Sequence, residues 1–229
     1  MSHSRTSLWL YTPGPSSLTD SISYSSLLSE IKVDLEVGTV MMMGRPCPEK
    51  RMTRLYAMTS TQMRYSGRVV TPIIPEATSQ IHQLLQHINT VEFAREMTQL
   101  GLPKTVLPHF NAVFVNWYRP PSLTTSLDGL GYHADDETDL ESDVILSLTL
   151  CPKGGERLFR FRAKRKEDGS VKTSGYDWEK ELENNSILVM LNRCQQQYKH
   201  TVVPRSTRLD RSKITGGRLN LTFRALRTY

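Results

Sequence analysis

The sequence has few cysteines and no long apolar run. Its 229 residues include three widely spaced cysteines, Cys47, Cys151 and Cys194. That number and spacing suit neither a disulfide framework nor a zinc knuckle, so we expect a reducing, intracellular environment, with nucleus or cytoplasm left open. No apolar segment approaches the roughly 20 residues that a membrane helix needs. The short SLWLY patch near the N-terminus is soon broken by prolines, so we expect neither a membrane span nor a secretory signal.

Internal repeats, low-complexity tracts and linkers are also missing. The length therefore favours one domain over residues 1–229, and 38% hydrophobic with 23% charged residues favours a soluble, globular chain. The chain carries 29 Lys+Arg against 23 Asp+Glu, and its pI is about 9.3. A basic surface attracts polyanions, so nucleic acid becomes a plausible partner.

The second half of the chain alternates β-branched and aromatic residues with polar ones, which predicts short strands. The expected strands cover residues 109–118, 144–150, 156–164, 186–191 and 217–226. In the first half, apolar residues at helical spacing predict a helix within 77–100, and Asp20 is a possible cap for another over 21–31. Helices first and strands later indicate an α+β fold, in which helices support an antiparallel sandwich or barrel.

A candidate metal site begins with His133 and Asp135, which are separated by one residue. On an extended segment these two side chains point the same way. His200 is the candidate third ligand, a short polar segment after the strand predicted at 186–191. Two histidines and one carboxylate suit a non-haem Fe(II) that also binds a co-substrate and dioxygen. Because His-x-Asp is common by chance, ordinary packed or surface residues remain the alternative.

The predicted last strand, RLNLTFR, places four polar side chains on one face: Arg218, Asn220, Thr222 and Arg224. Such a face is able to bind a dicarboxylate at its two ends, because a guanidinium matches a carboxylate in a fork geometry. The alternative is an amphipathic strand with solvated arginines. The intervening apolar residues point into the core in either case: Leu219, Leu221 and Phe223.

The motifs NWY, HADDE, a later His and RLNLTFR, in that order, resemble the AlkB family of Fe(II)- and 2-oxoglutarate-dependent dioxygenases. The likeness is best over residues 116–224. It implies a double-stranded β-helix (jelly-roll) core over 109–226 with supporting N-terminal helices. Residues 1–50 would form an N-terminal extension with the first helix. The segments GRPCPEKRMTRLYA and MRYSG resemble the family's substrate lid, which would cover 51–70.

The resemblance also implies a cofactor set of Fe(II), 2-oxoglutarate and dioxygen, and a role for each matching residue. Fe(II) would be held by His133, Asp135 and His200. Arg218 would bind the distal carboxylate of 2-oxoglutarate, and Arg224 would lie near the carboxylate that chelates iron. The rest of the implied 2-oxoglutarate site is Asn116, Tyr118, Asn220 and Thr222. The implied reaction demethylates N-methylated bases in nucleic acid and releases formaldehyde, succinate and CO2.

Substrate contacts are expected at the mouth of the site and in the lid. Asp136 and Glu137 complete the HxDDE pattern and would either favour a cationic methylated base or support the metal ligands. Lid residues that would contact or stack on the base, unless they are core or rim, are Arg54, Tyr56, Met58 and Tyr65. The remaining acidic residues of the 132–143 stretch are expected in a solvated turn: Asp139, Glu141 and Asp143.

Two basic runs are candidates for phosphate contacts, with solvated charge as the alternative reading. The first comprises Arg160, Arg162 and Lys164, followed by Arg165 and Lys166. The second precedes the last strand and comprises Arg205, Arg208, Arg211 and Lys213.

The favoured function is a monomeric demethylase acting on methylated DNA or RNA. One alternative keeps the cofactors but acts on protein, as a hydroxylase or demethylase. The other is a nucleic-acid-binding module without catalysis.

Overall fold

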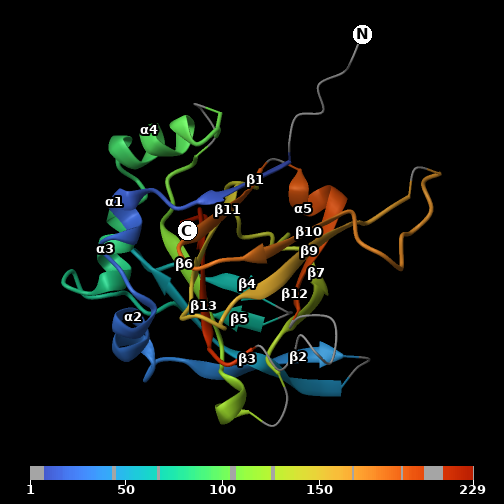
Figure 1. The fold of residues 1–229 in the computed structure, drawn as a ribbon, viewed down its shortest axis with the longest axis horizontal. Helices are drawn as coiled ribbons and strands as arrows, with labels where there is room; N and C mark the ends of the chain where they lie inside the picture. The colour runs from blue at the N-terminus through green and yellow to red at the C-terminus, as the bar shows by residue number, and fades with distance from the viewer. Residues whose placement is uncertain are drawn as a thin grey trace.

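The computed structural model describes residues 8–42, 45–65, 68–103, 107–124, 127–166, 168–191, 193–203 and 214–228, without the side chains of residues 41 and 42. Its larger layer is a seven-stranded antiparallel sheet in the order β1-β11-β8-β13-β6-β3-β2 (Figure 1). The strands are β1 (Trp9–Pro13), β2 (Glu36–Met42), β3 (Arg45–Ala57), β6 (Ala112–Tyr118), β8 (Ile145–Leu150), β11 (Ser186–Met190) and β13 (Arg218–Arg224).

The smaller layer is a four-stranded antiparallel sheet in the order β10-β9-β12-β7. Its strands are β7 (Leu130–His133), β9 (Arg157–Ala163), β10 (Trp178–Leu182) and β12 (Tyr198–Val203). A short hairpin of β4 (Met63–Tyr65) and β5 (Arg68–Val70) stands beside them. Side chains of both layers, such as Tyr118, Met190, Phe159 and Val202, pack together in one buried cluster. The two facing layers confirm the predicted α+β jelly-roll core.

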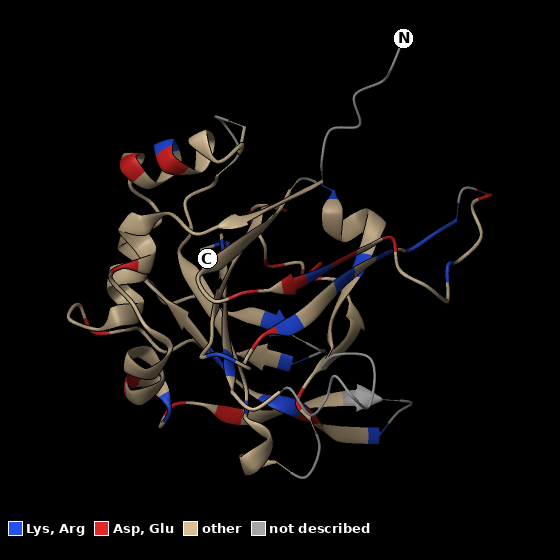
Figure 2. Ribbon diagram, in the orientation of Figure 1, with Lys and Arg blue, Asp and Glu red and all other residues tan. Residues whose placement is uncertain are grey.

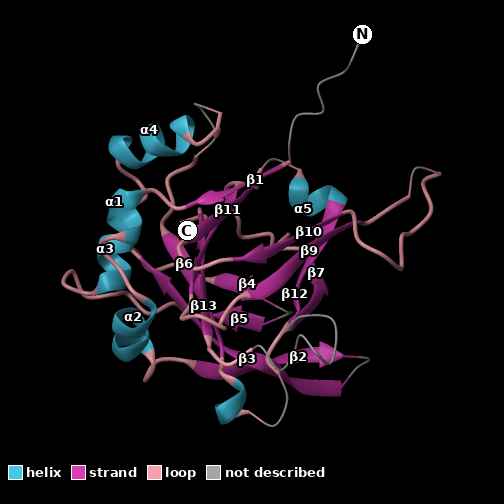
Figure 3. Cartoon of the chain, in the orientation of Figure 1, coloured by secondary structure: helices cyan, strands magenta, loops and turns pink. Residues whose placement is uncertain are grey.

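The helices gather on one side of the molecule, where they cover the outer face of the larger sheet (Figure 3). They are α1 (Ser16–Thr19), α2 (Tyr24–Ile31), α3 (Gln80–His87) and α4 (Val91–Gln99), whereas the short α5 (Cys194–Gln197) and η1 (Pro121–Leu123) lie elsewhere. Leu27 of α2, Leu84 of α3 and Phe93 of α4 belong to the same buried cluster as Leu219 and Leu221 of β13. The apolar side chains of the last strand therefore enter the core, as expected. None of the helices in the described ranges is long and apolar enough to cross a bilayer.

Two helix predictions need correction. The helix expected within 77–100 is broken into α3, which ends at His87, and α4, which begins after Thr90, whose hydroxyl accepts the Phe93 N–H at 3.2 Å. Asp20 is not an N-cap; it follows α1, whereas the Ser23 hydroxyl caps α2 by accepting the Ser26 N–H. In both cases a hydroxyl takes over an unsatisfied amide at a helix start.

The five predicted strands are present with slightly shorter ends, but the expectation that strands belong mainly to the second half is wrong. Strands β1 to β5 all precede residue 71. The edge strand β1 pairs only with β11, and its Trp9 ring stacks 4.4 Å from that of Phe161. A five-residue strand that depends on partners so far along the chain has no local periodicity to reveal it.

The central strand β13 offers a direct test of this packing. Leu221 is 0% exposed, with Val115 and Leu148 as its cross-strand neighbours. Leu221→Ala should lower the free energy of unfolding by about 2–5 kcal/mol in denaturant titrations, because the cavity left behind cannot fully collapse. Val33→Ala, at a side chain that is 89% exposed, is the matched control and should change it by less than about 0.5 kcal/mol. Equal effects at the two sites would contradict the assigned core.

Candidate metal centre and co-substrate pocket

The smaller sheet brings the two histidines of the predicted metal site together. His133 ends β7, and His200 lies directly opposite it on β12. Asp135 follows two residues after His133, with its carboxylate 3.5 Å from His133 Nε2 and 3.7 Å from His200 Nε2. One possible ligand atom from each of the three residues lies within 4.8 Å of the others. Strand pairing thus brings His200 next to His133 and Asp135, which lie far from it in the sequence.

The protonation of these groups suits metal binding. His133 Nδ1 lies 2.9 Å from the carbonyl oxygen of Gly131 and donates to it, which leaves the Nε2 lone pair toward Asp135. Burial lowers the pKa of His133 below its ordinary value and that of His200 to about 3, so both are neutral at neutral pH. Burial alone would raise the pKa of Asp135, but Arg224 and the two histidines hold it below its ordinary value. Two neutral imidazoles and one carboxylate fit Fe(II).

The backbone of Asp135 is held by a residue that the sequence did not point to. Gln195, buried on α5, accepts the Asp135 N–H at 2.9 Å through its side-chain oxygen. Its amide nitrogen lies 3.0 Å from the sulfur of Met190. The sequence shows only a polar run here, and nothing local marks which glutamine turns inward.

Pairing of β6 with β13 aligns the polar residues of the predicted co-substrate site: Arg218 lies opposite Tyr118, and Asn220 lies opposite Asn116. Arg218 is fully buried, and its Nη2 donates to Asn220 Oδ1 at 2.8 Å and to Thr149 Oγ1 at 3.0 Å. Within the described part of the chain, Arg218 Nε and Nη1 have no hydrogen-bond partner. A buried guanidinium with two unused donors is costly by itself and fits an incoming carboxylate.

At the other end of β13, Arg224 joins the metal site to Glu137. Its Nη2 lies 3.1 Å from Asp135 Oδ1, and its Nη1 donates to Glu137 Oε2 at 2.9 Å. Burial would lower the pKa of Arg224, but the two carboxylates raise it above its ordinary value. Asp136 instead points outward and pairs with Lys164 at 3.2 Å. The HxDDE motif therefore divides into one carboxylate at the metal site, one inner ion pair and one outer ion pair.

One cavity of about 390 Å³, including its open mouth, is lined by the three candidate metal ligands and by most of the predicted co-substrate residues, whereas the more deeply buried Arg218 is not part of its lining. The predicted residues that line it are Asn116, Tyr118, His133, Asp135, His200, Asn220, Thr222 and Arg224, and the predicted lid contributes Arg51 and Tyr65. A second groove shares Tyr65 and Phe114 with the cavity and is lined also by Glu36, Val37, Glu49, Thr53, Arg54 and Val69. Tyr65 and Phe114 thus lie between the cavity and a groove that is formed by β2, β3 and the β4–β5 hairpin.

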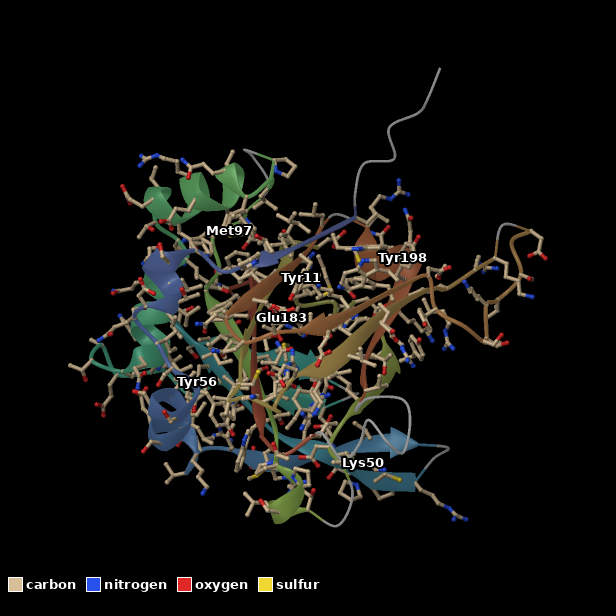
Figure 4. The ribbon with its side chains drawn as sticks, in the orientation of Figure 1. Tyr11, Lys50, Tyr56, Met97, Glu183 and Tyr198 are labelled. Atoms are coloured by element: carbon tan, nitrogen blue, oxygen red, sulfur yellow. The ribbon has the colours of Figure 1, made fainter. Side chains whose placement is uncertain are left out.

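The residues of the predicted lid are separated by strand alternation. Tyr56 is 3% exposed, donates its hydroxyl to Asp34 at 2.8 Å and, with Met58, packs in the helix-covered core (Figure 4). The expectation that Tyr56 and Met58 face a substrate is therefore wrong. Arg54 pairs with Glu36 at 2.7 Å and reaches only the groove. Arg51, which sequence reasoning missed, faces the cavity; the period-two pattern of β3 is what would have found it.

Arg51 is held in place in the cavity wall. It is buried, its Nη2 donates to Glu49 Oε1 at 2.9 Å, and it also donates to the Tyr65 hydroxyl. Its Nε and Nη1 find no partner in the described ranges. The wall of the cavity therefore holds a buried guanidinium with two unused donors, together with the Tyr65 and Phe114 rings, whose centroids are 5.0 Å apart.

The predicted phosphate contacts already have partners within the protein. Arg160 forms an ion pair with Glu179, Arg162 lies 3.8 Å over the Tyr132 ring, and Lys164 pairs with Asp136. Figure 2 shows the resulting mixture of basic and acidic segments along β9 and β10. Arg165 donates to the carbonyl of Gly169, whereas no side-chain contact is recorded for Lys166 among the described residues. The second basic run, Arg205, Arg208, Arg211 and Lys213, lies outside the described residues.

One member of the expected solvated turn is not solvated. Asp139 is buried, and its carboxylate accepts the backbone N–H of Arg64 at 2.7 Å. It therefore fastens the β4–β5 hairpin to the segment that follows the metal ligands. Glu141 and Asp143 are exposed, as expected.

Comparison with known proteins agrees with this geometry. A sequence model of the 2OG-Fe(II) oxygenase superfamily matches residues 23–224. The chain belongs to this superfamily. It is 24% identical over 203 residues to "Uncharacterized protein R406" of Acanthamoeba polyphaga mimivirus, an alignment that covers 89% of this chain and 87% of the relative. The solved structure of OsALKBH1 matches with a TM-score of 0.52 and 21% identity, over 95% of this chain and 97% of that one.

The protein thus has an AlkB-like fold and is an oxidoreductase. Its superfamily uses Fe(II), 2-oxoglutarate and dioxygen. The residues present fit those groups: a His-Asp-His cluster with free lone pairs, and a buried arginine with unused donors in the same interior.

The role of Gln195 is testable by metal binding. Gln195→Leu keeps the side-chain size but removes the acceptor for Asp135 N–H, so Fe(II) or Mn(II) affinity should fall by about tenfold or more, as outer-shell changes do at other metal sites. Calorimetric titration with Mn(II) measures it. Gln196→Leu is the matched control, because Gln196 is exposed and contacts only Asp143 among the described side chains. Unchanged affinity in a folded Gln195→Leu protein would refute the role.

Proposed function

We propose that this oxygenase removes N-methyl groups from bases in DNA or RNA. The observation that carries the proposal is the cavity wall, which combines the two unused donors of Arg51 with the Tyr65 and Phe114 rings. Aromatic faces stack on any base, and arginine donors match the acceptors on base edges. Because a base inside a duplex cannot reach a buried metal, the target would have to leave its stack.

Metal and co-substrate would be held by the residues described above. His133, Asp135 and His200 would ligate Fe(II), and Arg218 would bind the distal carboxylate of 2-oxoglutarate beside Tyr118. When bound, the iron together with 2-oxoglutarate and dioxygen supplies the oxidising power, while the protein positions the methyl group. Asn116, Asn220 and Thr222 would line the co-substrate between its two ends.

The protein's own charges would orient these groups. Arg224 holds the Asp135 carboxylate from one side, and Gln195 fixes its backbone from the other, so the carboxylate is ready to ligate. Glu137 faces Arg224 inside the site, whereas Asp136 is exposed and pairs with Lys164. In the proposed enzyme, Glu137 supports the metal ligands. Phosphate contacts from Arg160, Arg162 and Lys164 would require exchange of their present partners.

We also propose that residues 1–229 act as one oxygenase domain in which 51–70 forms a substrate lid. The lid assignment is supported by the groove between β2, β3 and the β4–β5 hairpin, which shares Tyr65 and Phe114 with the cavity.

The deciding experiment is a panel of oligonucleotides that carry 1-methyladenine, 3-methylcytosine or N6-methyladenine, with loss of the methyl group followed by mass. We expect at least one to be demethylated in the presence of Fe(II) and 2-oxoglutarate. His133→Ala should abolish turnover while the circular dichroism spectrum stays unchanged. Failure of the whole panel, together with robust turnover of a peptide, would replace nucleic acid with protein as the substrate; a fully active His133→Ala would refute the metal assignment.

The proposed contact of Arg51 with the base is testable by substitution. Arg51→Met removes the two donors that face the cavity and should reduce kcat/KM on the best oligonucleotide by about tenfold or more, the cost of a lost charged hydrogen bond. Decarboxylation of 2-oxoglutarate without substrate should change little. Lys50→Met, at the exposed neighbour labelled in Figure 4, is the matched control and should retain wild-type kinetics. Equal losses in both variants would argue for general charge attraction instead.

A further inference from the structure

The interior contains a further fully buried arginine, Arg157, which the proposed mechanism does not use. On β9, buried residues alternate with partly exposed ones, so Arg157, Phe159 and Phe161 share the inward face. Phe159 lines the co-substrate cavity. Arg157 therefore enters the space between the sheets from the smaller sheet, whereas Arg218 enters it from the larger one.

The hydrogen bonds of Arg157 hold it near Arg218. Its Nη2 donates at 3.2 Å to the carbonyl of Gly216, shortly before Arg218 in the chain, and its Nη1 donates at 2.8 Å to that of Gly155. Its Nε has no partner in the described part of the chain. Burial, and then the positive charge of Arg218, lower the pKa of Arg157 to about 10. Two like charges are thus held close together away from water.

Among the described residues, no carboxylate forms an ion pair with either guanidinium. Asp128 is close enough to affect Arg157, but Arg119 already binds it in a fork, with Nε–Oδ2 at 2.9 Å and Nη2–Oδ1 at 3.1 Å. The backbone N–H of Arg119 also donates to Asp128. This part of the interior therefore holds two buried cations that have no counter-charge among the described residues. An anion would stabilise such an arrangement.

Tyr118 connects these cations to the cavity. Its side chain lines the cavity, the Arg218 guanidinium lies 5.3 Å from its ring, and both arginines interact electrostatically with its hydroxyl. Arg218 and Arg224 occupy opposite ends of β13, and Arg224 is at the metal site. The two buried cations therefore lie behind the cavity lining, next to Tyr118 and on the side that is remote from the metal site.

We propose that Arg157 is a second positioning arginine for the distal carboxylate of the 2-oxo acid, and that with Arg218 it selects a dianionic co-substrate over a monoanionic one. This rests on the proposed role of Arg218. In a buried site of low dielectric constant, both guanidiniums attract a carboxylate, even where only one of them forms the bidentate hydrogen bonds. The competing explanation is that Arg157 only fastens the turn at residues 155–156 to Gly216.

The test compares 2-oxoglutarate with 2-oxobutyrate, which lacks the distal carboxylate, by anaerobic calorimetric titration of the Fe(II)-loaded protein. Arg157→Gln removes the charge but keeps an amide donor for the backbone carbonyls. We expect 2-oxoglutarate affinity to fall by about tenfold or more, and 2-oxobutyrate affinity to change by less than about twofold. Arg157→Lys, with its charge on a shorter side chain, should lie between wild type and Arg157→Gln.

Each result decides between the explanations. Equal weakening of both acids, or unchanged binding of both, would overturn the role of Arg157. If Arg157→Gln does not fold, Arg157→Lys decides in its place: it must weaken 2-oxoglutarate several-fold and spare 2-oxobutyrate. Arg218→Met distinguishes this inference from the proposed function. If Arg218→Met loses 2-oxoglutarate binding while the Arg157 variants bind normally, only the role of Arg157 is refuted. If all variants bind normally, the roles of both Arg157 and Arg218 are refuted.

Discussion

The two-faced strand β13 organises the protein. All seven of its residues are buried, yet alternate side chains leave on opposite sides: leucines and a phenylalanine toward the helices, and arginines, an asparagine and a threonine toward the smaller sheet. A polar inner face is tolerated because the neighbouring strands provide partners, as Ser147 does for Asn220 at 2.9 Å. Register with β6 and β8 then fixes which polar groups meet, so the geometry of the pocket follows from the pairing of three strands.

Among the described residues, buried arginines are paired with carboxylates at one end of the interior and lack carboxylate partners at the other. Near the metal site, Arg224 is matched by Asp135 and Glu137, so the ligand carboxylate is already ionised and oriented. At the far end, Arg157 and Arg218 face carbonyls, a hydroxyl and an amide. Burying unmatched charge costs stability, and proteins keep such arrangements where a ligand completes them. The asymmetry agrees with a co-substrate that carries charge at the end remote from the metal.

Much of this was predictable, because period-two alternation marks faces without long-range information. It identified the inner face of β13, the strand of Asn116 and Tyr118, and the pairing of His133 with Asp135 on one side of an extended segment. It failed where contacts between distant segments decide. Asp139 is buried because the β4–β5 hairpin meets it, and Gln195 turns inward because Asp135 is there. Arg54 and Tyr56 were chosen from the wrong face of a strand whose alternation was readable.

Strand order also determines how late in folding the three candidate metal ligands come together. The edge strand β1 is complete at residue 13 but pairs with β11, and His133 meets its partner only when β12 is in place. Contacts of such large sequence separation form slowly, because the intervening chain must be ordered before they stabilise anything. During synthesis, therefore, most of the chain must leave the ribosome before a complete three-ligand set exists. In the proposed enzyme, iron acquisition would therefore be a late event, and incompletely folded chains would offer the metal a partial site at most.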